Sequence, residues 1–165
     1  MPSTPRVSIV TATYNRSNVL RYTIESVRAS TLSDWEQVIV GDACTDDTAD
    51  VVAAFRDARL RFVNLPKNVG EQSGPNNEGV RLARGRYVAF LNHDDLWLPQ
   101  HLEETLNALD DTGADMVFTL SITIDARQRE RLAGVTSAGR YERGCFAPAS
   151  SWVCRRELFD EVGPW

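Results

Sequence analysis

The sequence predicts an α/β domain in which a mostly parallel sheet is flanked by helices. Short β-rich apolar runs alternate with helix-like segments up to residue 120, which is typical of βαβ units. Several runs are apolar throughout, as in strands that are buried on both faces of a sheet. The chain has 165 residues, enough to bury a core without disulfides or metals and few enough for a single domain.

The strands are predicted from composition and from their flanking turn residues. Residues 7–14 are β-rich and mostly apolar, and a turn follows them. Residues 87–91 form an apolar run long enough for one buried strand. The predicted strands, in chain order, are 7–14, 38–40, 60–65, 86–92 and 114–120.

The helices are predicted from apolar spacing and end signals. Leu20, Ile24 and Val27 recur at helical spacing, and Asn15 is expected to cap the helix that contains them. The next helix should begin near Thr48, where acidic residues favour the positive end of the helix dipole. The full set is about 17–29, one from 46–48 with Val51, Val52 and Phe55 on its buried face, 76–83 ended by Gly85, 100–110 ended by Gly113, and 156–162.

The chain after residue 120 is less regular. Residues 122–124 should extend the preceding strand or pair with it. Residues 126–150 show no clear period, and their glycines together with Pro148 indicate loops.

Composition excludes some classes of protein. The net charge of −5 and the interspersed charges argue against a nucleic-acid-binding surface. No apolar stretch approaches about 18 residues, so no transmembrane segment is expected. The three cysteines form no metal or redox pattern, and no signal-peptide layout is present. We therefore expect reduced thiols and a cytoplasmic protein, with a place at the inner face of the membrane left open.

Polar groups follow three of the predicted strands. Thr13 and Tyr14 end the first strand, Asp42 ends the second, and Asn92 to Asp95 end the strand at 86–92. The carboxyl ends of parallel strands share one edge, where open α/β sheets bind ligands. We expect Asp42 to accept a base N–H and Asp94 to hold Mg²⁺ or Mn²⁺ on a diphosphate.

The same segments resemble the family 2 glycosyltransferases of the GT-A fold. Residues 7–16 are similar to that family's V-S-[IV]-[IV]-x-P-[TS]-Y-N-R, and residues 40–48 to V-D-D-G-S-T-D-[DG]-T. Residues 68–99 resemble N-x-G…N-x-G…G-x-Y-[IV]-x-F-L-D-x-D-D-x-[WL]-x-P. The resemblance covers about residues 5–120, and more loosely the chain to Trp165.

The resemblance implies an inverting transfer of sugar from a nucleotide-diphosphate sugar, with a UDP-sugar as the expected donor and a glycan or lipid-linked molecule as acceptor. It implies that Asp42 recognises the base of the nucleotide and that Asp94 binds a divalent metal, Mn²⁺ or Mg²⁺. The metal would neutralise charge on the departing diphosphate. The residues expected to bind the nucleotide-sugar are Ala12, Thr13, Tyr14, Asp42, Asn76, Asn92 and His93.

Three positions depart from the family pattern. Gly41 replaces the first Asp of the D-D pair, and Asn92 replaces the first Asp of D-x-D. Asn76 stands where many members have Arg. The family's catalytic base lies beyond the region matched here, so residues 1–165 are expected to be one domain truncated on the acceptor side, and no catalytic residue is assigned.

Other interpretations stay open. The chain could be a donor-binding fragment or an inactive relative that binds nucleotide-sugar without turnover. A phosphoacceptor receiver domain would need a late lysine, but none follows Lys67, and a nucleotidyltransferase would need a Gly-rich basic loop after the first strand. Asp95 suits a helix cap or a neighbour-orienting role equally. Trp97 and Leu98 are expected in the core, whereas Trp152 fits the core or the acceptor side.

Overall fold

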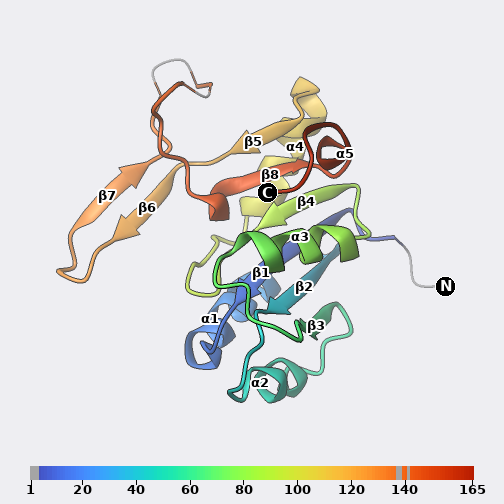
Figure 1. Cartoon of the computed structure of the whole chain (residues 1–165). Helices are drawn as coiled ribbons and strands as arrows, with labels where there is room; N and C mark the ends of the chain where they lie inside the picture. Colours follow the sequence, from blue (N-terminus) through green and yellow to red (C-terminus); the bar gives the residue numbers. More distant parts are fainter. Residues whose placement is uncertain (1–3, 137–138, 141) are drawn as a thin grey trace.

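The computed structural model describes residues 4–136, 139–140 and 142–165. Helices cover both faces of a six-stranded sheet with the strand order β3-β2-β1-β4-β8-β5, and a separate two-stranded hairpin stands apart from it (Figure 1). The strands are β1 Val7–Thr13, β2 Trp35–Gly41, β3 Leu60–Asn64, β4 Tyr87–Phe90, β5 Met116–Phe118, β6 Ser121–Ile124, β7 Glu130–Ala133 and β8 Trp152–Arg155. The helices are α1 Ser17–Arg28, α2 Thr48–Ala54, α3 Ser73–Leu82, α4 His101–Thr112, the short 3₁₀ turn η1 Ala149–Ser151, and α5 Leu158–Val162.

The sheet is mostly parallel, as predicted. β1 lies between β2 and β4 and is parallel to both. The sequence did not predict β8, which pairs antiparallel with β4 on one side and with β5 on the other. Because β8 alone is reversed, the carboxyl ends of β1, β2 and β4 meet at one edge.

Two apolar layers hold the helices on the sheet. On one face, Val27 of α1 and Leu106 of α4 pack with Ile9 and Tyr87 of the sheet. On the other face, Val80, which precedes the end of α3, packs with Val10, Val88 and Phe90. β1 and β4 are thus covered on both sides, which accounts for their mostly apolar composition.

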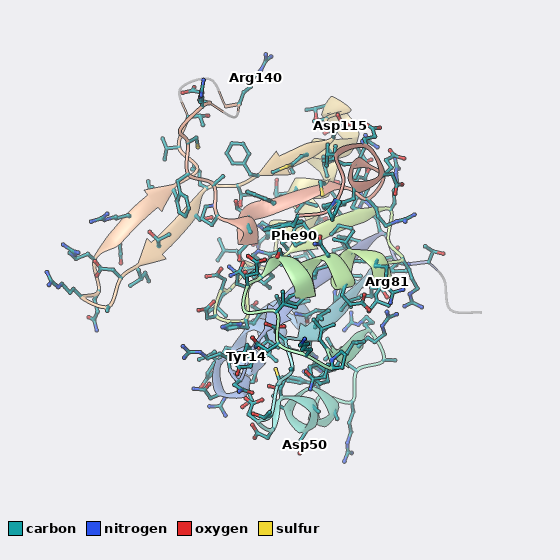
Figure 2. The ribbon with its side chains drawn as sticks, in the orientation of Figure 1. Tyr14, Asp50, Arg81, Phe90, Asp115 and Arg140 are labelled. Atoms are coloured by element: carbon teal, nitrogen blue, oxygen red, sulfur yellow. The ribbon has the colours of Figure 1, made fainter. Side chains whose placement is uncertain are left out.

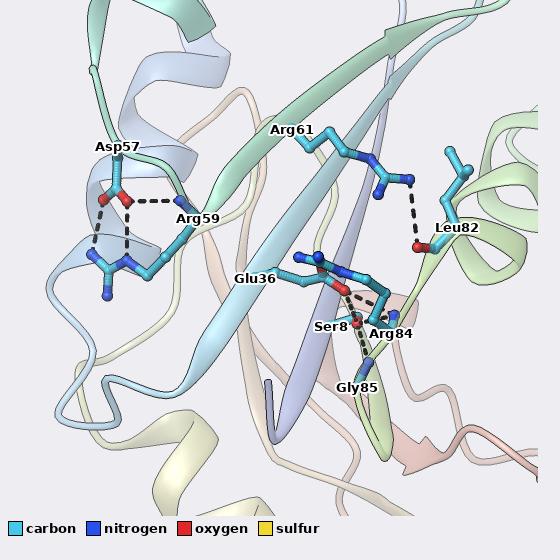
Figure 3. Close-up of polar contacts among 8 residues, drawn as sticks. All are labelled: Ser8, Glu36, Asp57, Arg59, Arg61, Leu82, Arg84 and Gly85. Carbon is cyan, nitrogen blue, oxygen red and sulfur yellow. Dashed lines mark hydrogen bonds and ion pairs between the residues drawn. The ribbon is translucent and has the colours of Figure 1, made fainter. Parts of the chain in front are cut away.

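β2 begins three residues before the predicted strand because polar residues are buried in it. Glu36 and Gln37 are 3% and 0% exposed. The Nε2 atom of Gln37 donates a hydrogen bond to Thr11 Oγ1 at 3.0 Å. Glu36 accepts hydrogen bonds from Ser8 Oγ at 2.7 Å and from Arg84 Nε and Nη2 at 2.8 and 2.6 Å (Figure 3). Buried polar groups with partners of this kind do not show in a hydrophobic pattern.

The predicted role of Gly85 as a helix C-cap was wrong. α3 starts at Ser73, earlier than predicted, and Ala83 in extended conformation ends it. A Cβ atom on Gly85 would lie 2.6 Å from the backbone nitrogen of Ser8, so glycine is needed there for close approach to β1. Gly113, with φ +68°, does end α4 as predicted.

The irregular part of the chain contains one hairpin and few other elements. β6 pairs with β7, which had not been predicted, and it neither extends nor pairs with β5. Leu98 is 78% exposed, so its predicted place in the core was wrong, whereas Trp97 packs against the core. Trp152 packs against the cluster around Phe90.

No helix in the described part of the chain is long and apolar enough to cross a bilayer. All three cysteines are free, and burial raises the pKa of the Cys154 thiol to about 12.

Candidate functional site

A pocket of about 280 Å³ opens at the carboxyl ends of β1, β2 and β4. The structure brings five of the predicted donor-binding residues together there, namely Ala12, Thr13, Tyr14, Asp42 and His93. Tyr14, labelled in Figure 2, is half exposed. The other lining residues are Asn68, Gly70, Glu71, Gln72 and Pro75.

Asp42 is buried beneath the loop that follows β3. Its Oδ1 accepts a hydrogen bond from the amide of Val69 at 2.8 Å, and its Oδ2 accepts one from the amide of Gly70 at 3.0 Å. Asn68 Nδ2 donates to the carbonyl oxygen of Asp42 at 2.9 Å. Each carboxylate oxygen keeps a second lone pair, so Asp42 can still accept a hydrogen bond from a ligand.

Thr13 lines the same pocket and has a buried, unpaired hydroxyl. The residue is 2% exposed, and its Oγ1 atom has no hydrogen-bond partner among the described residues. A buried polar group without a partner costs free energy, which a ligand atom that bonded it would recover.

The loop at 68–72 is a part of the pocket that sequence reasoning did not assign. The N-x-G pattern at Asn68 was quoted as a family motif, and that signal could have marked the loop as site-forming. Gly41 also has a packing reason. A Cβ atom there would lie 2.5 Å from Asn64 Oδ1, and the Asn64 side chain is bonded to the backbone of Cys44. This chain therefore has no room for the Asp that the family pattern carries at this position.

The polar side chains that follow β4 point to three different surroundings: the pocket wall, the solvent and the neighbouring Asp95. His93 Nδ1 lies 3.1 Å from the carbonyl oxygen of Ala12, which turns the ring toward the pocket wall. Asp94 is 63% exposed at its side chain, and its Oδ2 lies 4.0 Å from His93 Nε2. Asn92 and Asn76 are not among the pocket-lining residues. Asn92 donates to Asp95 Oδ2 at 3.2 Å, and Asn76 is 3% exposed on α3.

Two residues distant in the sequence, Thr23 and Ser150, hold this segment in place. Thr23 Oγ1 of α1 lies 2.8 Å from the carbonyl oxygen of His93 and 3.0 Å from that of Asp95. Ser150 Oγ accepts a hydrogen bond from the amide of Asn92 at 3.0 Å and donates one to Asp95 Oδ2. Trp97 Nε1 donates to the carbonyl oxygen of Ser150 at 2.6 Å. Asp95 is thus hydrogen-bonded to Asn92 and Ser150, which agrees with the neighbour-orienting alternative.

The predicted cap role of Asn15 was wrong. Its Oδ1 accepts a hydrogen bond from the amide of Thr45 at 2.8 Å, so it ties the end of β1 to the loop after β2. The amide of Ser17, at the start of α1, is met by Asp46 Oδ2 at 3.1 Å. Asp46 Oδ1 also accepts a hydrogen bond from the amide of Thr48, at the start of α2.

The donor atoms here suit a metal that is held jointly with a phosphate ligand. In the part of the chain that the structure describes, no three His, Cys, Asp or Glu side chains form a metal cluster. Asp94 offers one exposed carboxylate, and Mg²⁺ commonly binds through one or two carboxylates together with substrate phosphates and water. Among the described residues that line the pocket there is no lysine or arginine, so these residues bring no positive side-chain charge to a diphosphate.

The sequence of the chain matches a known protein family over most of its length. Residues 8–163 match the sequence model of the family described as "Glycosyl transferase family 2". The chain belongs to glycosyl transferase family 2. This confirms the family resemblance that the motifs indicated.

Two relatives place the chain within this family. It is 35% identical over 117 residues to the putative teichuronic acid biosynthesis glycosyltransferase TuaG of Bacillus subtilis, covering 70% of this chain and 46% of the relative. It is 32% identical over 104 residues to WfaP of Escherichia coli, a UDP-Glc:alpha-D-GlcNAc-diphosphoundecaprenol beta-1,3-glucosyltransferase, covering 63% and 41%. The chain thus spans about half the length of these family 2 relatives or less.

Two solved structures share the fold. The Staphylococcus aureus TarS structure in complex with UDP-GlcNAc superposes with a TM-score of 0.79 at 21% identity, over 94% of this chain and 47% of TarS. The mannosyltransferase PcManGT from Pyrobaculum calidifontis, in complex with GDP-Man and Mn²⁺, gives 0.71 at 20% identity, over 99% and 48%. The glycosyl transferase family 2 chain therefore has the expected GT-A architecture.

Proposed function

We propose that this chain is the donor-binding part of an inverting, metal-dependent glycosyltransferase. It would take a sugar from a nucleotide-diphosphate sugar, with UDP as the nucleotide, and pass it to a glycan or lipid-linked acceptor in the cytoplasm. The observation that supports this best is the pocket at the ends of β1, β2 and β4, where Asp42, Thr13 and Tyr14 converge.

The nucleotide end of the donor would lie against Asp42. The carboxylate offers an acceptor to a base N–H while the amides of Val69 and Gly70 fix its orientation. Thr13 Oγ1 provides a further polar group, and the exposed ring of Tyr14 provides a flat apolar surface for a base. We propose that Asn76 and Asn92 act on the donor through shaping this site, since neither lines the pocket.

The diphosphate end would lie toward His93 and Asp94. Asp94 is the residue that would hold Mn²⁺ or Mg²⁺, and His93 lies beside it on the pocket wall. The metal, when bound, supplies Lewis-acid neutralisation of the diphosphate charge as the nucleotide leaves. Thr23 and Ser150 hold the backbone and the neighbouring Asp95, which would keep the exposed Asp94 carboxylate in place.

The relatives support the coarse assignment. TuaG is named for teichuronic acid biosynthesis, and WfaP for glucosyl transfer from UDP-Glc to a diphosphoundecaprenol-linked sugar. TarS was solved with UDP-GlcNAc and PcManGT with Mn²⁺. Because the chain spans about half of such proteins, we propose that it provides the donor side of a larger transferase whose acceptor side includes the catalytic base.

A second candidate is a module that binds the donor without turnover. The two acidic side chains that line the pocket are Asp42 and Glu71. Asp42 is bound to two backbone amides, which suits a binding role better than that of a general base.

Calorimetric titration of UDP, GDP and dTDP, each with and without Mn²⁺, tests the proposed function. We expect UDP to bind more tightly than the other two, and Mn²⁺ to strengthen its binding. A chain that binds none of the three in the presence of Mn²⁺ contradicts the proposal. Binding of UDP-sugar without sugar release to water or to an added glycan acceptor would favour the donor-binding module.

A further inference from the structure

The β6–β7 hairpin stands away from the six-stranded sheet (Figure 1). Its register pairs Ile122 directly with Leu132, and Ile124 lies two residues further along β6. Since alternate residues of a strand point to the same side, Ile122, Ile124 and Leu132 share one face of the hairpin. Glu130, which pairs with Ile124 beside the connecting turn, lies on the same face.

That face is turned outward. Ile122, Ile124 and Leu132 are 68%, 67% and 65% exposed, whereas the alternate polar residues Ser121 and Thr123 of β6 are less exposed. A strand that served the core of its own domain would hide the apolar side instead. Further exposed apolar side chains continue toward the base of the hairpin, where the amide of Gly134 bonds the carbonyl oxygen of Phe146. They are Leu120, Val135 and Phe146.

The same segment is rich in arginine although the whole chain is acidic. Residues 120–146 contain five arginines against three acidic residues, in a chain with a net charge of −5. Arg129 is paired with Asp125 at 2.6 Å. Within the described residues, neither Arg127 nor Arg131 has a carboxylate partner within ion-pair distance. Arg127 lies in the connecting turn, and Arg131 pairs with Thr123 on the face opposite the isoleucines.

We propose that the β6–β7 hairpin is a membrane-contact element that lays its apolar face into the surface of an anionic lipid bilayer. An interfacial element needs apolar side chains on one side and cations that can reach the headgroups on the other. The isoleucine face provides the first, with Glu130 at its turn end, and Arg127 and Arg131 provide the second.

The test is flotation of the purified chain with vesicles of equal parts phosphatidylglycerol and phosphatidylcholine, and with phosphatidylcholine alone. We expect the chain to float with the anionic vesicles and to float poorly with the neutral ones. The double variant Ile122→Ser with Ile124→Ser should lower partition into anionic vesicles by roughly tenfold or more. The matched control, Leu98→Ser with Val162→Ser, removes two comparably exposed apolar side chains elsewhere and should float like the wild type.

Two further measurements locate the contact. Arg127→Gln with Arg131→Gln should weaken binding and reduce its salt dependence. Ile124→Trp should gain fluorescence that brominated lipids quench, measured against the wild-type background. The proposal is overturned if the wild type does not float, or if the isoleucine variant floats like the wild type. It is also overturned if the wild type binds no lipid and forms a dimer that the isoleucine variant abolishes, since the face would then bind a second copy.

The proposal does not depend on the proposed transferase function. The hairpin lies outside the six-stranded sheet, so its variants should keep both the melting temperature and the affinity for UDP. A chain that binds UDP and ignores lipid would refute the hairpin proposal alone. A chain that binds lipid and ignores nucleotides would refute the proposed function alone.

Discussion

The Oδ2 atom of Asp42 lies 3.0 Å from the backbone nitrogen of Gly70 and accepts its hydrogen bond. Together with the bond from Val69 to Oδ1, this contact joins the end of β2 to the loop that forms one wall of the pocket. The residue proposed to contact the base therefore also holds the wall against which the base would lie, and a change at Asp42 should affect both.

Asp42→Asn should weaken UDP binding at least tenfold and lower the free energy of unfolding by roughly 1–3 kcal/mol. The amide group of Asn would set an N–H against one of the two backbone amides, leaving a buried donor unpaired. Calorimetry and urea unfolding measure the two effects. Asp47→Asn, at an exposed residue whose side chain makes no cap hydrogen bond, is the control and should change neither. Unchanged UDP affinity in Asp42→Asn would remove this residue from the site.

Thr13→Val should act in opposite directions on affinity and stability. Because Oγ1 has no partner, removing it should leave the free energy of unfolding within about 1 kcal/mol of the wild type or raise it. UDP affinity should fall if the donor bonds this hydroxyl. For comparison, Thr23→Val removes a hydroxyl with two acceptors nearby and should lower stability. Wild-type UDP affinity in Thr13→Val would show that the hydroxyl does not contact the donor.

Asp94→Ala should abolish the increase in UDP affinity that Mn²⁺ produces and leave the metal-free affinity nearly unchanged. Its exposed side chain contributes little to folding, so the melting temperature should stay the same. Titrations of UDP with and without Mn²⁺ provide the measurement, and Asp111→Ala, at an exposed position on α4, is the matched control. A variant that kept the full Mn²⁺ effect would place the metal elsewhere.

Glu36→Gln should lower stability by about 2 kcal/mol at neutral pH, because Arg84 would lose a charged partner beneath it. Burial would raise the pKa of Glu36, but hydrogen bonds from Arg84 and Ser8 outweigh it and hold the pKa below the ordinary 4.5. A lowered folded-state pKa stabilises the protein above the unfolded-state value, and this contribution is lost as the pH falls below 4.5. The difference between wild type and variant in urea unfolding should therefore shrink below pH 4.5, and a constant difference would contradict this. Glu25→Gln, on the exposed side of α1, is the control.

Acidification should also lower stability through His101, in a pH window above that of Glu36. Burial lowers the pKa of its ring to about 4 from the ordinary 6.5, its Nε2 has no partner among the described residues, and the ring stacks on Trp97 at 4.3 Å. Between pH 6.5 and about 4 the unfolded chain binds a proton that the folded chain does not. Stability should thus fall by roughly 2–3 kcal/mol as the pH drops through that window. His101→Phe keeps the stacking and should flatten the curve of melting temperature against pH; an unchanged slope would exclude His101 as its source.

Apolar continuity decided which strands could be predicted. β1 is a mostly apolar run and β4 an uninterrupted one, and both were predicted within two residues of their observed ends. β2 was recognised only from Val38, because Glu36 and Gln37 are buried polar residues whose partners lie on β1 and after α3. Nothing in the local sequence identifies those partners before the fold is known.

Strand β8 could not be predicted because its partners are far away in the sequence. Its four residues insert between β4 and β5, more than thirty positions away in the sequence, and no periodicity in a strand so short indicates a partner. The residue types at Asp42, Thr13, Tyr14 and His93 sufficed to expect them at one edge, because parallel strands share their carboxyl ends. Ser150 was not foreseen, since a serine in a loop carries no sign of which buried groups it will meet.

The hydrogen bonds of Ser150 also affect the order in which parts of the site form during synthesis of the chain. β1, β2 and β4 can pair once the first half of the chain has left the ribosome, but Asn92 and Asp95 receive their partner only after residue 150 has followed. Insertion of a late strand between two earlier ones closes a long loop and is slow for entropic reasons. A nascent chain would therefore form the pocket wall around Asp42 first and fix the segment that carries Asp94 last, so that the proposed base contact would be complete before the proposed metal site.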